Sequence, residues 1–203
     1  MHATKNATVV RETGTNRAHD TTQDTTHDVE HLEDVVRNPI AQWALVGLRF
    51  VLGFTFLWPF LDKLFGLGYG TPSKGAWING GSPTTGFLTK NPTVVDGPFG
   101  GFMANFAGGI WDYLFMFGLL GIGVAVLLGA GMKIAAWSGA VLLAFMYFAQ
   151  FPIGRGGEGF NNPLFDSHWI EALGLIVLAY TFAGDKLGLG RWWSKIVGNT
   201  WLR

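Results

Sequence analysis

Four long apolar segments, separated by polar stretches, make up most of the chain after residue 40. They run from Trp43 to Phe65, Trp111 to Ala130, Ile134 to Phe151 and Leu164 to Ala183. An α-helix needs roughly 20 apolar residues to cross the hydrocarbon core of a bilayer, and each segment is close to this length. Runs of Leu, Ala, Gly and Phe favour helices over the alternating pattern of a membrane β-barrel. The pattern predicts an all-α integral membrane protein, a four-transmembrane-helix bundle.

A long connection, from Gly66 to Asn105, joins the first two segments and is rich in Gly, Pro, Ser, Thr and Asn. Connections longer than about 15 residues are usually functional or disordered. This one carries apolar side chains between its turns: Trp77, Ile78, Phe87, Leu88, Val94, Val95, Phe99 and Phe102. We therefore expect a long structured loop that caps one end of the bundle.

The two ends of the chain differ from its apolar middle. Residues 1–37 are polar, Thr-rich and acidic, so this N-terminal segment is predicted to be disordered, apart from a short polar helix between Asp28 and Arg37. Residues 38–184 form the predicted transmembrane domain. Residues 185–203 alternate tryptophans with Arg191, Lys195 and Arg203, which is typical of a basic aromatic tail lying on the membrane surface.

Composition supports the membrane assignment and excludes some chemistry. Only 14% of the 203 residues are charged and 49% are apolar, whereas a soluble domain carries about 25% charged residues. Glycine is frequent, and Gly118, Gly121 and Gly123 in the second segment predict close approach of helices. The chain has no cysteine, which excludes disulfides, iron–sulfur clusters and thiol catalysis within it.

The distribution of basic residues predicts an orientation. Four crossings place both termini and the 131–133 turn on one side, which carries Arg37, Lys133, Lys186, Arg191, Lys195 and Arg203. The other side carries Lys63, Lys74, Lys90 and Arg155. The positive-inside rule favours a multi-pass protein of the plasma membrane with cytoplasmic N- and C-termini. The lipid bilayer is the expected surrounding, and no nucleic-acid partner is expected.

Ionisable residues within the apolar segments mark candidate sites, because such groups are costly inside a membrane. Arg49 lies about two turns into the first segment, where it either snorkels to the interface, pairs with a carboxylate or serves a site. His168 and Glu171 are three residues apart and share one helical face. The tentative catalytic residues are His168, Glu171, Arg49 and Lys63. The tentative substrate-binding residues are Asp62, Asp112, Gln150, Arg155 and Asp166.

Except for Arg49, these residues are expected near one end of the bundle, beneath the loop. Two interpretations are open: an ion-pair network that locks the helices together, or a polar pocket in which His168 and Glu171 relay protons to a small ligand or a quinone head group. A haem with two histidine ligands is not expected, since His168 is the one histidine at membrane level. His168 and Glu171 lack further nitrogen or sulfur ligands for a metal. The glycines at 66–70 lack the strand–turn–helix context of a nucleotide site.

Two stretches of the sequence resemble a known family. "LRFVLGFTFLWPFLDKLFGLG" in the first segment and "NPLFDSHWIEALGLIVLAY" in the last are similar to the DoxX/DoxD family. The intervening "AWINGGSPTTGFL" resembles the loop of DoxD-like members, which include the small membrane subunit of thiosulfate:quinone oxidoreductase. The resemblance covers about residues 38–190. It places the family's intramembrane Arg on Arg49, its helix-end Lys on Lys63 and its last-helix His on His168.

The resemblance implies a four-helix membrane protein linked to quinone-dependent redox chemistry, working with a second subunit or a soluble redox enzyme. Menaquinone or ubiquinone is the expected substrate, with thiosulfate or another sulfur donor as the reductant. Whether this chain itself is an enzyme is left open. The alternatives are a non-catalytic membrane anchor or assembly scaffold for soluble redox enzymes and, ranked lower, a small-molecule carrier.

Overall fold

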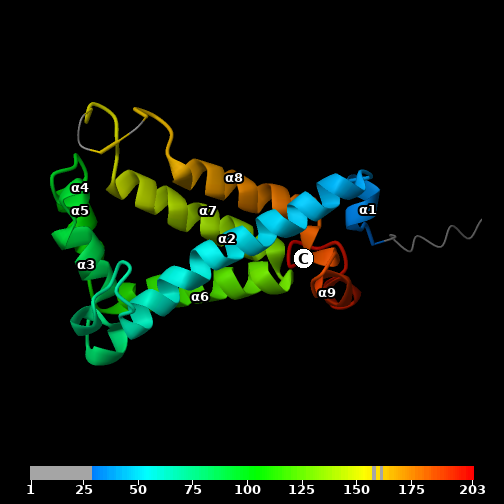
Figure 1. The fold of residues 1–203 in the computed structure, drawn as a ribbon, viewed down its shortest axis with the longest axis horizontal. Helices are drawn as coiled ribbons and strands as arrows, with labels where there is room; N and C mark the ends of the chain where they lie inside the picture. Colours follow the sequence, from blue (N-terminus) through cyan, green and yellow to red (C-terminus); the bar gives the residue numbers. More distant parts are fainter. Residues whose placement is uncertain (1–28, 157–158, 161) are drawn as a thin grey trace, which may run out of the picture.

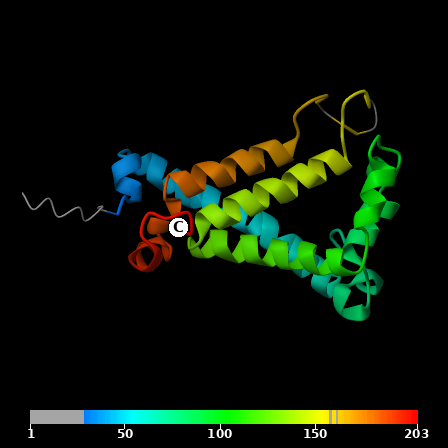
Figure 2. The ribbon, with the colours of Figure 1, turned by 180° about the vertical axis from the view of Figure 1, so that it is seen from behind.

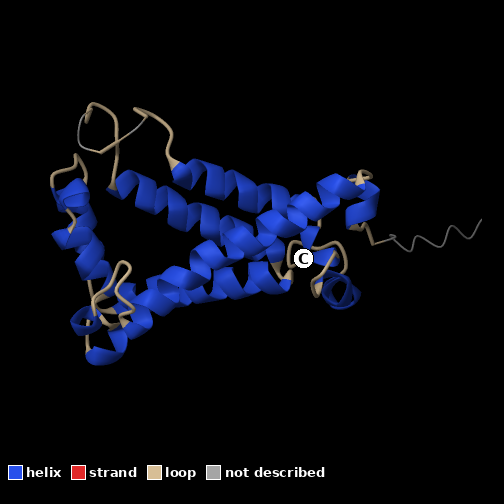
Figure 3. Cartoon of the chain, viewed as in Figure 1, coloured by secondary structure: helices blue, strands red, loops and turns tan. Residues whose placement is uncertain are grey.

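The computed structural model describes residues 29–156, 159–160 and 162–203, and the regular elements in this part of the chain are helices (Figure 3). Three of them are long and apolar enough to cross a membrane: α2 (Pro39–Phe65), α6 (Ile110–Leu128) and α7 (Met132–Ala149). A shorter apolar helix, α8 (Ser167–Tyr180), follows. By helix length and hydropathy the chain is a multi-pass membrane protein. The prediction of disorder for residues 1–28 lies outside the described residues.

Local sequence signals set the ends of these helices. Asn38 caps α2, because its side-chain oxygen accepts hydrogen bonds from two backbone N–H groups of the first turn, and Pro39 occupies the first helical position. Asp166 caps α8 in the same way, so this helix begins three residues after the predicted start of the segment. Gly129 and Gly131 adopt positive φ and make the short turn between α6 and α7.

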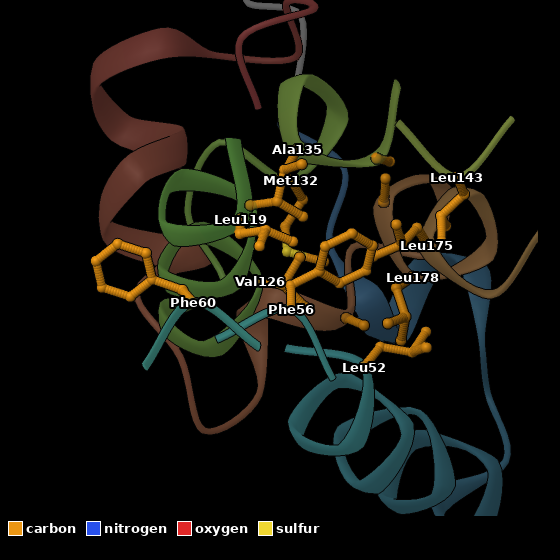
Figure 4. Close-up of a cluster of buried hydrophobic side chains, with 14 of the residues drawn as sticks. Leu52, Phe56, Phe60, Leu119, Val126, Met132, Ala135, Leu143, Leu175 and Leu178 are labelled. Atoms are coloured by element: carbon orange, nitrogen blue, oxygen red, sulfur yellow. The ribbon is translucent and has the colours of Figure 1, made fainter. Parts of the chain in front are cut away.

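The core lies where α2, α6, α7 and α8 cross (Figure 4). Its buried side chains include Leu52, Phe56, Met116, Leu119, Ile122, Val126, Leu143, Leu175 and Leu178. The α2–α6 contact is close: a Cβ added at Gly123 would lie 2.8 Å from the Leu57 nitrogen, and one at Gly53 would lie 2.7 Å from Leu127. Of the three glycines expected to bring helices together, Gly123 does so. Gly118 and Gly121 have open space around the Cβ position.

The two ends of the bundle differ in shape. At one end α6 and α7 are joined by their turn, and from there they diverge toward the other end (Figures 1 and 2). The connection 66–109, which we call the cap, lies at that far end, the cap end. The cap is structured, as expected from its sequence. It contains the short helices η1 (Ser73–Gly75), η2 (Trp77–Asn79), α3 (Pro83–Lys90), α4 (Pro92–Val95), α5 (Gly100–Met103) and η3 (Ala104–Phe106).

At the opposite end, which we call the terminal end, residues from both ends of the chain meet. The elements there are α1 (Leu32–Val35), η4 (Ala183–Asp185) and α9 (Gly190–Val197). Leu32 is fully buried, so part of the predicted polar N-terminal segment is built into the fold. Helix α9 exposes Trp192 and Ile196 next to Lys195, in keeping with the amphipathic pattern of the tail.

Candidate functional site

Asp62 and Asp112 hold the cap to the helices. Asp62, near the end of α2, is buried and accepts hydrogen bonds from the backbone nitrogens of Tyr69 (3.1 Å) and Gly70 (2.9 Å). Asp112, in the first turn of α6, accepts from the backbone nitrogen of Thr84 (2.8 Å) and from its hydroxyl (2.6 Å). These carboxylates therefore connect the cap to α2 and α6.

Gln150 and Arg155, which follow α7, anchor another part of the cap. The Gln150 amide donates to the hydroxyl of Thr93 at 3.1 Å, and the Arg155 guanidinium donates to the Thr93 carbonyl at 2.7 Å. Arg155 is buried and also lies over the ring of Phe160, 5.2 Å from its centroid. The structure therefore does not join Asp62, Asp112, Gln150 and Arg155 into the single cluster that the sequence suggested. Each is bound to the segment of the cap nearest to it.

Arg49 lies at the terminal end, apart from the other candidates. Its side chain is fully buried, so it does not snorkel, and one guanidinium nitrogen donates to the carbonyl of Leu187 (2.5 Å) and to that of Lys186 (3.3 Å). No carboxylate of the described residues lies within ion-pair distance of it, and its Nε and Nη1 have no hydrogen-bond partner there. Helix α8, about 20 Å long, separates this region from His168.

Lys63 is half-buried at the cap end of α2. Its ammonium group lies 6.0 Å from the centroid of the Phe115 ring on α6. Its neighbour Asp62 is occupied by the cap, and no carboxylate in the described part of the chain comes within 4.0 Å of the ammonium. Lys63 therefore lies over an aromatic ring and forms no close ion pair with the described carboxylates.

Asp166, His168 and Glu171 are gathered in the first turns of α8. Asp166 accepts a hydrogen bond from the backbone nitrogen of His168 at 3.1 Å, and its other oxygen lies 2.8 Å from Nδ1 of the imidazole. The His168 side chain is 14% exposed and that of Asp166 26%. Glu171 is half-buried one turn further along the helix. These three candidates are brought together as the sequence predicted, and Asp166 fixes the orientation of the ring.

His168 also lines a cavity of about 230 Å³ between α7 and α8. Its wall is mainly aliphatic, with the aromatic side chains Tyr147, Phe148 and Trp169 near His168. The rings of Tyr147 and Trp169 contact edge to face with centroids 5.5 Å apart, and the Tyr147 hydroxyl donates to the Leu164 carbonyl at 2.7 Å. No pattern in the sequence indicates this cavity, because its shape depends on how α7 and α8 are oriented.

A second cavity, of about 640 Å³, lies between α6 and α7 on the other face of α7. Its walls are apolar and aromatic, with residues from α6, α7 and the cap. This cavity was not predicted from the sequence either. The one available signal was Gly118, a residue without a side chain in a helix of large apolar residues.

The terminal end carries a polar network that the sequence did not suggest. Asp185, with 1% of its side chain exposed, lies 2.9 Å from Nδ1 of His31 and 2.9 Å from the guanidinium of Arg203. Glu33 pairs with Arg191 at 2.7 Å. The pKa of the Glu33 carboxyl lies below its ordinary value, because the group accepts a backbone hydrogen bond and lies beside Arg191. This network joins the start of the described chain to its end.

No group of three or more His, Asp or Glu side chains suited to a metal ion occurs within residues 29–156, 159–160 and 162–203. No protein-family model matches the chain, and no match is found among curated proteins or among solved structures. The site must therefore be judged on its own geometry.

Proposed function

We propose that this chain is a membrane subunit of a quinone-linked redox system, similar to DoxX/DoxD proteins, that binds the head group of menaquinone or ubiquinone between α7 and α8. One observation carries the proposal: an imidazole held by a carboxylate, His168 on Asp166, lines an apolar cavity that also contains Tyr147, Phe148 and Trp169. An apolar cavity with aromatic side chains on one side suits a quinone ring, and histidine is the side chain whose proton exchanges near neutral pH.

The chemistry follows from the two ring nitrogens. With Nδ1 donating to Asp166, Nε2 of His168 is the nitrogen available to a carbonyl or hydroxyl of the ligand. A protonated imidazole donates to a quinone oxygen, and a neutral one accepts a proton from a quinol. Glu171, three residues along the same helix, provides a second proton-carrying group on the same face. Proton transfer at His168 is thus the contribution that this chain's residues make.

Electrons come from elsewhere in this proposal. Conversion of a quinone to a quinol takes up two electrons and two protons, and this chain has no cysteine to ligate an iron–sulfur cluster. The electrons pass from a sulfur donor such as thiosulfate, directly or through a partner subunit. Whether the chain alone is catalytic depends on which of these routes operates.

The proposal includes four membrane crossings with cytoplasmic termini. Helix α8 has 14 residues and is about 21 Å long, shorter than the roughly 30 Å hydrocarbon core. Residues 181–185 extend it toward the terminal end, and a short helix is accommodated by local thinning of the bilayer. With this topology, His168 lies near the outer surface.

The test is binding of a short-chain quinone to the detergent-solubilised protein. His168→Ala is expected to weaken binding by about tenfold, equivalent to about 1.4 kcal/mol, because a hydrogen bond to the quinone oxygen is lost. His31→Ala is the matched control, since His31 is also paired with an aspartate, Asp185, but lies outside the cavity. Equal affinities for the wild type and His168→Ala, with both proteins folded, would refute the proposal.

The second candidate function is a scaffold for soluble redox enzymes. It is favoured because several polar candidates, including Asp62, Asp112 and Arg155, form hydrogen bonds to the cap. Deleting residues 1–28 is the suitable experiment, since Leu32, His31 and Glu33 take part in the fold and must be retained. Under the scaffold hypothesis the truncated protein inserts into membranes but no longer co-purifies with its partner from the native host. If the truncated protein still co-purifies with the partner, residues 1–28 are not the segment that binds it.

A further inference from the structure

The larger cavity is a groove between α6 and α7. Its lining includes Trp111, Leu114, Gly118 and Ile122 of α6 and Ser138, Val141 and Phe145 of α7. From Trp111 to Ile122 the helix rises about 16 Å, so the groove extends over roughly half the thickness of a hydrocarbon core. Val141 and Leu114 are 68% and 58% exposed, which places the groove on the lipid-facing surface.

The cap holds the groove open at its end. Thr84 and Leu88 of α3 and Phe106 of η3 complete the lining there. The Phe106 ring lies between α6 and α7, with its centroid 4.9 Å from Trp111 and 5.2 Å from Phe145. The Thr84–Asp112 hydrogen bonds fix α3 to α6, and Phe106 forms an aromatic wedge that packs between α6 and α7.

The lining of the groove is suited to binding a hydrocarbon chain and not a charged group. The lining contains no ionisable side chain. Its Thr84 hydroxyl is already used, donating to Asp112 at 2.6 Å and accepting from the Gly108 nitrogen at 2.7 Å. An apolar cavity of this kind does not hold water stably. In a bilayer, the molecules that meet a sideways opening between membrane-spanning helices are lipids.

We propose that this groove binds an acyl chain of a membrane phospholipid, which supplies the packing that α6 and α7 lack between the wedge and their turn. The acyl chain enters the groove sideways from the bilayer. The lipid head group stays outside, because residues of the cap close the end of the groove. The site is separate from the quinone cavity, since the two lie on opposite faces of α7. If lipid binding in the groove is disproved, the proposed quinone binding between α7 and α8 is therefore unaffected.

Two glycines of α6 offer a matched pair of variants. A Cβ added at Gly118 or at Gly121 meets no atom within 4 Å, so neither substitution strains the backbone packing. Gly118 lines the groove and Gly121 does not. Gly118→Leu thus fills the groove, while Gly121→Leu adds the same side chain to the same helix outside it.

The experiment is photolabelling of the whole protein, reconstituted in phosphatidylglycerol vesicles that contain a trace of the same lipid with a diazirine in one acyl chain. Mass spectrometry then maps the labelled residues. We expect labelling concentrated on the groove residues in the wild type and in Gly121→Leu, and roughly tenfold lower in Gly118→Leu, because the added side chain occupies the space that the acyl chain would fill. Val141→Phe, on the opposite wall, gives the same test if Gly118→Leu does not fold.

Three results would overturn the proposal. Labels spread evenly over the lipid-facing residues would show ordinary bilayer contact. Groove labelling that is unchanged in both filling variants would show that the chain lies elsewhere. Groove labelling that is displaced by a long-chain isoprenoid quinone, but not by added phospholipid, would assign the groove to an isoprenoid chain.

Discussion

Arg49 is a buried cation whose partners are backbone carbonyls rather than an acid. It lies against the ends of several segments: its hydrogen-bond acceptors belong to Lys186 and Leu187, and its guanidinium abuts Gly129 and Gly188. Gly129 follows the last turn of α6, where the helix dipole presents negative partial charge. The guanidinium is thus stabilised without a carboxylate, and it requires neighbours with no side chain.

Replacing Gly129 tests this arrangement. A Cβ at Gly129 would overlap the Arg49 guanidinium and lie 2.6 Å from the Gly184 Cα, and the residue has φ of 71°. We expect Gly129→Ala to lower the free energy of unfolding in detergent by about 2–5 kcal/mol, the sum of backbone strain and overpacking. Gly131→Ala is the control: it has φ of 68° but open space around its Cβ, and should lose about 1–2 kcal/mol. Equal losses would mean that close packing at Arg49 contributes nothing.

Helix α3 is the element on which the cap depends. Thr84, in its first turn, gives the Asp112 carboxylate two hydrogen bonds and accepts a third from Gly108. Leu88 on the same helix is 2% exposed and packs with Val94, Met103 and Ala149. A helix of eight residues is too short to be stable alone, so these tertiary contacts maintain it.

Loss of the Thr84 hydroxyl should therefore loosen the cap without unfolding the bundle. Thr84→Val leaves the buried Asp112 oxygen with one hydrogen bond fewer, at a cost of about 1–3 kcal/mol. We expect faster amide hydrogen exchange across residues 83–106 and unchanged exchange in α2 and α7. Thr89→Val is the control, because the Thr89 hydroxyl is exposed and bonds only within α3. If both variants exchange alike, the Asp112 contact does not hold the cap.

The whole molecule is closed at the terminal end and wide at the cap end. At the terminal end, Asp185, Arg203 and His31 connect the N-terminal and C-terminal parts of the described chain. At the cap end α6 and α7 diverge, and the cap spans the distance between their ends (Figure 1). Both cavities lie along α7, the helix that forms a wall of each.

The orientation of this asymmetric molecule is testable because the chain has no cysteine. Single cysteines placed at Thr89 in the cap and at Lys195 in α9 are both at exposed positions. With cytoplasmic termini, an impermeant maleimide added to intact cells should label Thr89→Cys and not Lys195→Cys. Labelling of Lys195→Cys alone would show the opposite topology. Both variants should react after the cells are lysed.

The sequence by itself determined the helical membrane character, three of the long helices, the structured cap and the grouping of Asp166, His168 and Glu171. These features are local: apolar run length sets a crossing, Asn38 and Asp166 cap helices, and residues three or four apart on one helix, such as His168 and Glu171, stay neighbours in any fold. Local signals also overestimated the last crossing, because the Asp166 cap delays α8 and its regular helix ends at Tyr180.

Only the tertiary structure decided what the other polar residues do. Arg49 meets carbonyls more than 130 residues away, and Asp112 meets Thr84 across 28 residues, so neither partner can be found from spacing. The structure likewise decided that Gly123 packs against α2 while Gly118 opens into a groove, since that depends on which face of α6 each neighbour covers. The physical reason is that burial and partner choice follow from helix orientation, which no local pattern encodes.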